Sequence, residues 1–131
     1  MQISPVEALI AKKCVPCEGG VESCSLEHSN SQLKLLPDWQ LSAGNAEIYR
    51  NFVFKNFVQA VSCFNQIAEL AELEAHHPDL HRTGYRNIKI ALSTHAIGGL
   101  SENDFILAAK IDALVAEFFP KVATGNYGTQ N

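Results

Sequence analysis

The hydrophobic pattern changes its period near residue 78, and this change constrains the fold more than any other feature of the sequence. Between residues 56 and 75 apolar side chains recur every three or four positions, which predicts an amphipathic helix of about five turns. The apolar stripe consists of Phe57, Val61, Phe64, Ala68 and Ala71. Pro78 should stop this helix, because proline cannot continue one. From Ile88 to Leu92 the period becomes two, which predicts a half-buried strand that continues through Thr94 to His95.

The segments on either side extend this pattern. Residues 39–41 and 48–54 alternate around a run of turn residues and predict a hairpin. Gly98 and Gly99 indicate the turn that closes the later strand. Ser101 to Asp104 matches a capping box, so a final helix is expected to run until Pro120.

Two shorter helices are expected near the N-terminus. One covers residues 4–13, with Ser4 as its cap and Pro5 at its first helical position, and the other covers residues 31–36. The helices are separated from paired strands rather than alternating with them. This order predicts an α+β fold in which helices cover one face of an antiparallel sheet. The exposed sheet edges and the opposite face would favour self-association.

Length and composition favour one globular domain. The chain has 131 residues, of which 47% are hydrophobic. Residues 1–28 are expected to form an N-terminal arm, appended to the core, that contains Cys14-x-x-Cys17. The compact domain is expected to span residues 29–120. Residues 121–131 are expected to form a flexible tail.

Charge and hydropathy argue against two classes of partner. The net charge of -4 offers no cationic surface for phosphates, so direct nucleic-acid binding is not expected. No stretch approaches the roughly 18 apolar residues of a membrane span, and the first 30 residues lack an apolar signal core. We therefore expect a protein of the cytosol.

The four cysteines leave two interpretations open. Three of them crowd into the N-terminal stretch and Cys63 lies in a helical pattern, so reduced thiols are the simpler reading. Cys63 would then be a packed core thiol. Cys14, Cys17, Cys24 and His28 also have the composition of a zinc knuckle, although a second close pair is missing.

Histidine carries the strongest functional signal. Four of the five histidines fall between positions 76 and 95. His76 and His77 stand where the long helix should end, Glu72 lies one helical turn before His76, and His95 leaves the end of the predicted strand. Imidazole supplies both an acid and a base near neutral pH, so two histidines from separate elements could act on opposite sides of one small substrate.

The same histidines allow two other interpretations. His76 and His77 could merely cap a helix, with His95 as a core residue. A metal could use imidazoles and a carboxylate from the set His76, His77, His81, His95 and Glu72. Adjacent histidines rarely bind one ion, however, and the chain has no His-x-x-x-His pair, so no metal is expected.

The sequence contains two ordered motifs, Glu72-x-x-x-His76-His77-Pro78 and Ser93-Thr94-His95-x-x-Gly98-Gly99-Leu100-Ser101-x-x-Asp104, with Leu107-Ala108 and Ile111-Asp112 beyond. Together they resemble the pterin-4a-carbinolamine dehydratases, a family also described as dimerisation cofactors of a homeodomain transcription factor. The resemblance covers about residues 36–119. It implies a four-stranded antiparallel sheet, assembly into homodimers or homotetramers, and no metal or organic cofactor.

The activity implied by the resemblance is the dehydration of 4a-hydroxytetrahydrobiopterin to quinonoid dihydrobiopterin and water. This reaction recycles the pterin cofactor of aromatic amino-acid hydroxylases. The alternative that the family name suggests is an oligomeric coactivator module that binds a helical transcription-factor partner, which would add the nucleus to the cytosol as a location.

The resemblance also implies residue roles. His76 and His95 would be the acid and base, His77 would bind and orient the pterin and share in proton transfer, and Glu72 would tune His76 or relay its protons. Pro78 would shape the pocket and Asp104 would cap the last helix. Hydrogen bonds to the pterin edge would come from Thr94, Ala96 and Ile97. The chain has Ala75 and Leu80 where many members carry an acidic and an aromatic residue, and Tyr85 could replace the aromatic.

Overall fold

The computed structural model describes residues 1–16 and 20–124, and its strands form one antiparallel sheet within these residues. Four strands follow one another across the sheet: β1 (Gln40–Leu41), β2 (Ile48–Val53), β4 (Asn87–Leu92) and β3 (Asp79–Thr83). A short β5 (Ala123–Thr124) also pairs with β2. The hairpin β1–β2 and the strand β4 confirm the sequence prediction, whereas β3 was not recognised as a strand.

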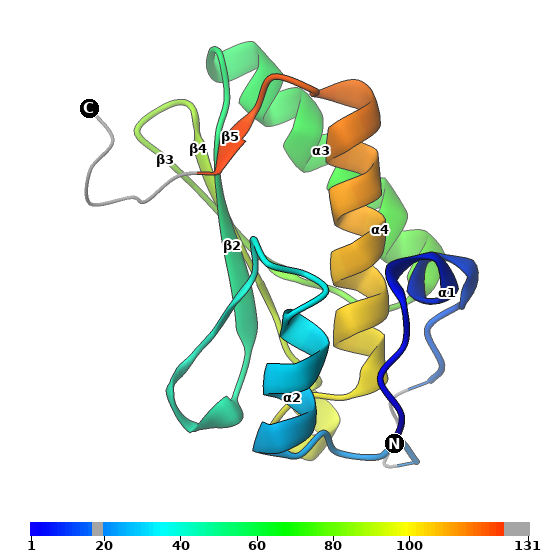
Figure 1. The fold of residues 1–131 in the computed structure, drawn as a ribbon. Coiled ribbons are helices and arrows are strands. Elements are labelled where there is room, and N and C mark those ends of the chain that lie inside the picture. The colour runs from blue at the N-terminus through cyan, green and yellow to red at the C-terminus, as the bar shows by residue number, and fades with distance from the viewer. Residues whose placement is uncertain (17–19, 125–131) are drawn as a thin grey trace.

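The two long helices, α3 (Phe57–Glu74) and α4 (Glu102–Phe118), lie on the same side of the sheet, as Figure 1 shows. The short helix α1 (Val6–Ala11) packs against α4 on the side away from the sheet, and α2 (Leu26–Leu33) packs beside β1. The core lies between sheet and helices and contains Phe52, Ile90 and Phe105, each fully buried. This arrangement confirms the predicted α+β class.

The buried face of α3 lies beside the predicted one. Its buried apolar positions are Ala60, Cys63, Ile67 and Ala71, while Phe57 remains 48% exposed. The helix carries apolar residues on a wide arc, so spacing alone could not identify the innermost stripe. Cys63 is a packed core thiol, as expected. Phe57, Val58 and Leu73 stay exposed, and self-association stays a prediction.

The N-terminal arm is part of the core, so the prediction of an appended segment was wrong. Leu9 is fully buried, and Cys14 and Cys24 are buried with it. Ser4 does not cap α1, because Pro5 occupies the capping position and the Ser4 backbone instead pairs with the Gln32 side chain at 3.0 and 2.9 Å.

The second short helix also differs from its prediction. It begins at Leu26 rather than near residue 31, because the Ser25 hydroxyl caps it by accepting a hydrogen bond from the His28 backbone at 3.0 Å.

Both motif segments depart locally from the expected helix and strand. The helix α3 ends before Pro78, because Ala75 adopts a left-handed conformation with φ of 53°. Strand β4 ends at Leu92, so His95 lies in a single 3₁₀ turn, His95–Ile97, instead of at the end of a strand. The glycine turn at Gly98 and the capping box of α4 are confirmed.

At the C-terminus, β5 pairs with β2, so residues 123 and 124 belong to the sheet and not to a flexible tail, and residues 125–131 lie outside the described part. Among residues 1–16 and 20–124, no helix combines the length and the apolar character that a membrane span needs.

Candidate active site

The three histidines singled out from the sequence meet at one small cavity. It has a volume of about 200 Å³ and lies between the segment that follows α3 and the segment that follows β4. Its lining consists of Ala75, His76, His77, Ser93, His95 and Ala96. Residues far apart in the sequence are therefore brought together as the two motifs required.

The turn at Ala75 sends the adjacent histidines in different directions. A left-handed residue at a helix end reverses the path of the backbone, and here the His76 amide bonds back to the Ala71 carbonyl at 3.3 Å. As a result His76 is only 5% exposed, whereas the side chain of His77 is 63% exposed. The two adjacent rings therefore lie in different surroundings.

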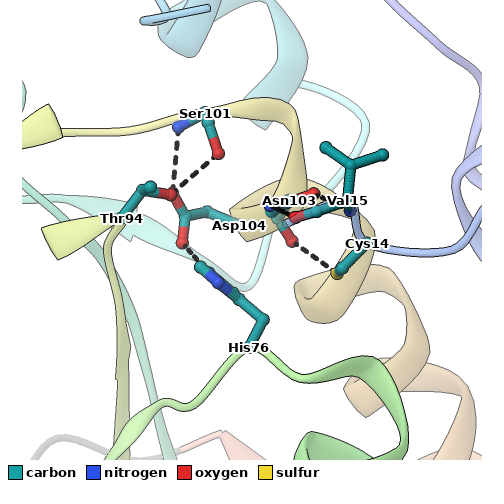
Figure 2. A network of polar contacts seen from close by, with 7 residues as sticks. All are labelled: Cys14, Val15, His76, Thr94, Ser101, Asn103 and Asp104. Atoms are coloured by element: carbon teal, nitrogen blue, oxygen red, sulfur yellow. Dashed lines mark hydrogen bonds and ion pairs between the residues drawn. The ribbon is translucent and has the colours of Figure 1, made fainter. Parts of the chain in front are cut away.

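His76 forms a buried pair with Asp104, the third residue of α4. The distance from Nε2 of His76 to Oδ1 of Asp104 is 2.7 Å, and Asp104 is fully buried. The other carboxylate oxygen accepts hydrogen bonds from the Thr94 hydroxyl at 2.8 Å and from the Ser101 amide at 3.0 Å. Figure 2 shows these partners converging on Asp104 from the β4 side, the α4 terminus and the end of α3.

This set of partners fixes the proton arrangement of His76. Thr94 and Ser101 both donate to Oδ2 of Asp104, which leaves Oδ1 to His76. With the carboxylate ionised, Nε2 of His76 carries the proton of the bond to Oδ1, and in the neutral ring Nδ1 carries the lone pair. A carboxylate that holds an imidazole in one tautomer prepares the opposite nitrogen to accept a proton.

His77 pairs instead with Glu72, at 2.5 Å between Nε2 and Oε2, and both side chains are largely exposed. The sequence had placed Glu72 next to His76, on the assumption that helical spacing continued to residue 76. The break at Ala75 shifts that contact by one residue.

The remaining predicted residues occupy different positions around the cavity. Ala96 lines it, but Thr94 is buried and faces Asp104, while Pro78 and Ile97 are half-buried and do not line it. Two residues were missed: Ser93, which lines the cavity, and Asp104, which had been assigned only as a cap. The position of Asp104 at the end of the second motif was the one available signal.

No metal-binding cluster of three or more histidine, cysteine or acidic residues is found within the described residues. His81 lies exposed on β3 and does not line the cavity. Burial raises the pKa of the Cys14 and Cys24 thiols to about 12, which favours the protonated form over a metal-binding thiolate. Cys17 lies outside the described residues, so the zinc-knuckle alternative stays untested.

Comparison with known proteins agrees with both motifs. The model of the family described as pterin 4 alpha carbinolamine dehydratase matches residues 22–114. A relative in Halorhodospira halophila that carries the same family name is 47% identical over 83% of this chain and 99% of its own. Pterin-4-alpha-carbinolamine dehydratase 2, mitochondrial, of Arabidopsis thaliana is 43% identical over 83% of this chain and 60% of its own.

A solved structure extends the similarity to the fold. The crystal structure of a transcriptional coactivator/pterin dehydratase from Brucella melitensis superposes with a TM-score of 0.67 at 32% identity. The match covers 71% of this chain and 98% of the Brucella chain.

Proposed function

This chain belongs to the pterin-4a-carbinolamine dehydratase family, and we propose that its histidine cavity dehydrates 4a-hydroxytetrahydrobiopterin to quinonoid dihydrobiopterin. The observation that carries the proposal is the buried His76–Asp104 pair, which presents an oriented imidazole to a cavity that two further histidines line. The reaction would recycle tetrahydrobiopterin.

The chemistry needs one acid and one base. The bond from C4a to its hydroxyl oxygen breaks as electrons from the ring nitrogen N5 form a double bond to C4a. An acid protonates the departing hydroxyl, which leaves as water, and a base takes the proton from the ring nitrogen. Histidine can supply both transfers near neutral pH, each worth roughly 100- to 10,000-fold.

The geometry supports a division of these roles. His76 is the base in this proposal, because its bond to Asp104 leaves the lone pair on Nδ1 and the buried carboxylate stabilises the imidazolium that forms. His95, exposed on the 3₁₀ turn, is the acid that protonates the hydroxyl. His77, which is hydrogen-bonded to Glu72, binds and orients the pterin from the rim.

The size of the cavity suggests how the substrate enters. Its volume of about 200 Å³ is below the roughly 300 Å³ at which sites for whole small molecules begin. In the proposed complex one edge of the pterin ring therefore enters the cavity and the rest of the molecule lies outside. In this proposal Ser93 and Ala96, which line the cavity, contact that edge.

The test is a stopped-flow assay with freshly generated carbinolamine, corrected for its spontaneous dehydration. We expect His76→Ala and His95→Ala each to lower kcat by roughly 100-fold or more. His81→Asn, which changes an exposed histidine outside the cavity, serves as the matched control and should keep wild-type turnover. Unchanged turnover in both folded cavity variants would reject the proposal.

The second candidate function is a binding module for a helical transcription-factor partner. The observation that favours it is the similarity to the Brucella protein, whose name includes a coactivator role. Fast turnover by the purified protein would rule out a purely binding role, and oligomeric state, measured by light scattering, would test the predicted homodimer or homotetramer.

A further inference from the structure

The N-terminal arm contacts both segments that carry the His76–Asp104 pair. Residues 12–15, called here the strap, run between the C-terminal end of α3 and the first turn of α4. His76 follows α3 by two residues, and Asp104 lies in the first turn of α4. The strap therefore joins the two segments whose separation sets the hydrogen bond between these residues.

On the α3 side, the strap satisfies polar groups at the end of the helix. Lys13 Nζ donates to the Leu73 carbonyl at 2.7 Å, one of the carbonyls that a helix end leaves without an intrahelical partner. The Cys14 amide donates to Glu74 Oε1 at 2.9 Å. Glu74 is only 7% exposed, and its second oxygen accepts from Lys110 of α4 at 2.6 Å. A buried carboxylate is costly without partners, so these bonds hold the end of α3 firmly.

On the α4 side, one side-chain amide pairs with the strap in both directions. Asn103 Oδ1 accepts from the Val15 amide at 2.9 Å, and Asn103 Nδ2 donates to the Val15 carbonyl at 2.8 Å. The Cys14 thiol donates to the Asn103 carbonyl at 3.6 Å. Asn103 is 2% exposed and immediately precedes Asp104. Figure 2 shows the Asn103–Val15 pair beside the His76–Asp104 pair.

We propose that the strap sets the distance between His76 and Asp104, and that Asn103 is a positioning residue for the base of the dehydratase. This inference rests on the proposed function, and it gives the arm a role that neither motif requires. A hydrogen bond weakens steeply when its atoms move beyond about 3.2 Å, so the bond of 2.7 Å tolerates little movement of either segment. A misplacement of about 1 Å near reacting groups can cost up to about 100-fold in rate.

The test removes the amide pair from each side in turn. Asn103→Ala deletes both bonds from α4, and Val15→Pro deletes the amide donor from the strap while leaving α4 unchanged. We expect each variant to lower kcat by about 10-fold with KM changed less than about twofold, because base placement suffers while the cavity lining remains. Glu102→Gln is the matched control, since it weakens Lys12–Glu102, a contact of the strap with α4 whose side chains are 42% and 38% exposed and which water already screens. It should leave kcat unchanged.

A second readout does not depend on turnover. In wild-type protein the Nε2 proton of His76, bonded to a buried carboxylate, should give a slowly exchanging signal in the histidine NMR spectrum. We expect that signal to exchange faster in both strap variants and to stay unchanged in Glu102→Gln. If wild-type protein shows no turnover, the proposed function fails, and this signal alone decides whether the strap positions His76.

Three results would overturn the inference. One is a folded strap variant with wild-type kcat and an unchanged His76 signal. Another is a lower melting temperature in both variants without change in either readout, which is the result a purely structural arm would give. The third applies if Asn103→Ala does not fold. Val15→Pro is then the deciding variant, and a wild-type His76 signal in it would overturn the inference.

Discussion

Two neighbouring histidines each face a carboxylate in this molecule, and their surroundings differ completely. In the His76–Asp104 pair the side chains are 6% and 0% exposed. In the His77–Glu72 pair they are 63% and 75% exposed. The residue types and distances are similar, so burial and the number of further bonds distinguish the pairs. Asp104 accepts two more hydrogen bonds from Thr94 and Ser101.

This difference makes the two adjacent histidines suited to different tasks. Water screens an exposed pair and both long side chains lose entropy in forming it, so such pairs contribute little to stability and position. A buried pair cannot exchange its partner for water, so its geometry and tautomer are fixed. His76 is therefore suited to proton transfer that needs an exact placement, and His77 to adjustable contact with a ligand.

The largest effect is expected from Asp104→Asn, which reverses the donor and acceptor roles in the buried pair with His76. The amide oxygen would remain with Thr94 and Ser101, so the amide nitrogen would face His76 and force its Nε2 to become an acceptor. The ring proton would move to Nδ1, the nitrogen proposed as the base. We expect kcat to fall by roughly 100- to 10,000-fold, measured by stopped-flow dehydration.

Asp112→Asn separates this effect from simple loss of stability. Asp112 is also on α4, accepts bonds from Arg50 at 2.6 Å and Trp39 at 2.9 Å, and lies away from the cavity. The Asp112→Asn variant should have a lower melting temperature but wild-type kcat. Equal kcat in Asp104→Asn and Asp112→Asn would mean that the His76 tautomer has no role in turnover.

A second prediction extends the comparison to two acids of α3, the exposed Glu72 and the buried Glu74. Burial alone would raise the pKa of Glu74, but hydrogen bonds from Lys110 and the Cys14 amide outweigh it and hold the pKa below its ordinary value of 4.5. A lowered pKa means that ionised Glu74 stabilises the folded state above about pH 4.5, and that this contribution is lost as the pH falls through the lowered value.

Glu74→Gln should accordingly reduce the free energy of unfolding by about 1–3 kcal/mol at pH 7. The difference from wild type should shrink when denaturant unfolding is repeated below pH 4.5. Glu69→Gln, an exposed glutamate on the same helix, should show no such difference at any pH. A Glu74→Gln deficit that is independent of pH would show that packing, and not the charge, is responsible.

Much of the fold was accessible from the sequence because its signals are local. The long helix, the hairpin, the strand at Ile88–Leu92 and the capping box at Ser101 all follow from periodicity or from a pattern of four residues. The clustering of histidines also identified three residues of the cavity lining.

The features that were missed depend on contacts between distant segments. Asp104 meets His76 across 28 positions, and Asn103 meets Val15 across 88, so no local pattern could pair them. The turn at Ala75 was hidden because an alanine in the left-handed region is unusual, and Pro78 offered a more obvious stop. That single turn moved the contact of Glu72 from His76 to His77.

The smallest effect is expected from Glu72→Gln, which tests the exposed half of the comparison. Glutamine keeps an oxygen that can accept from His77, and the lost charge is screened by water, so stability should stay within about 0.5 kcal/mol of wild type. Since His77 is proposed to orient the pterin, the change should fall on KM, by less than about threefold, with kcat maintained. The measurement is steady-state kinetics, in which kcat and KM of Glu72→Gln are compared with those of Asp104→Asn. If Glu72→Gln lowered kcat as strongly as Asp104→Asn, proton transfer would depend on the rim as much as on the buried pair, and burial would no longer explain the division between the two histidines.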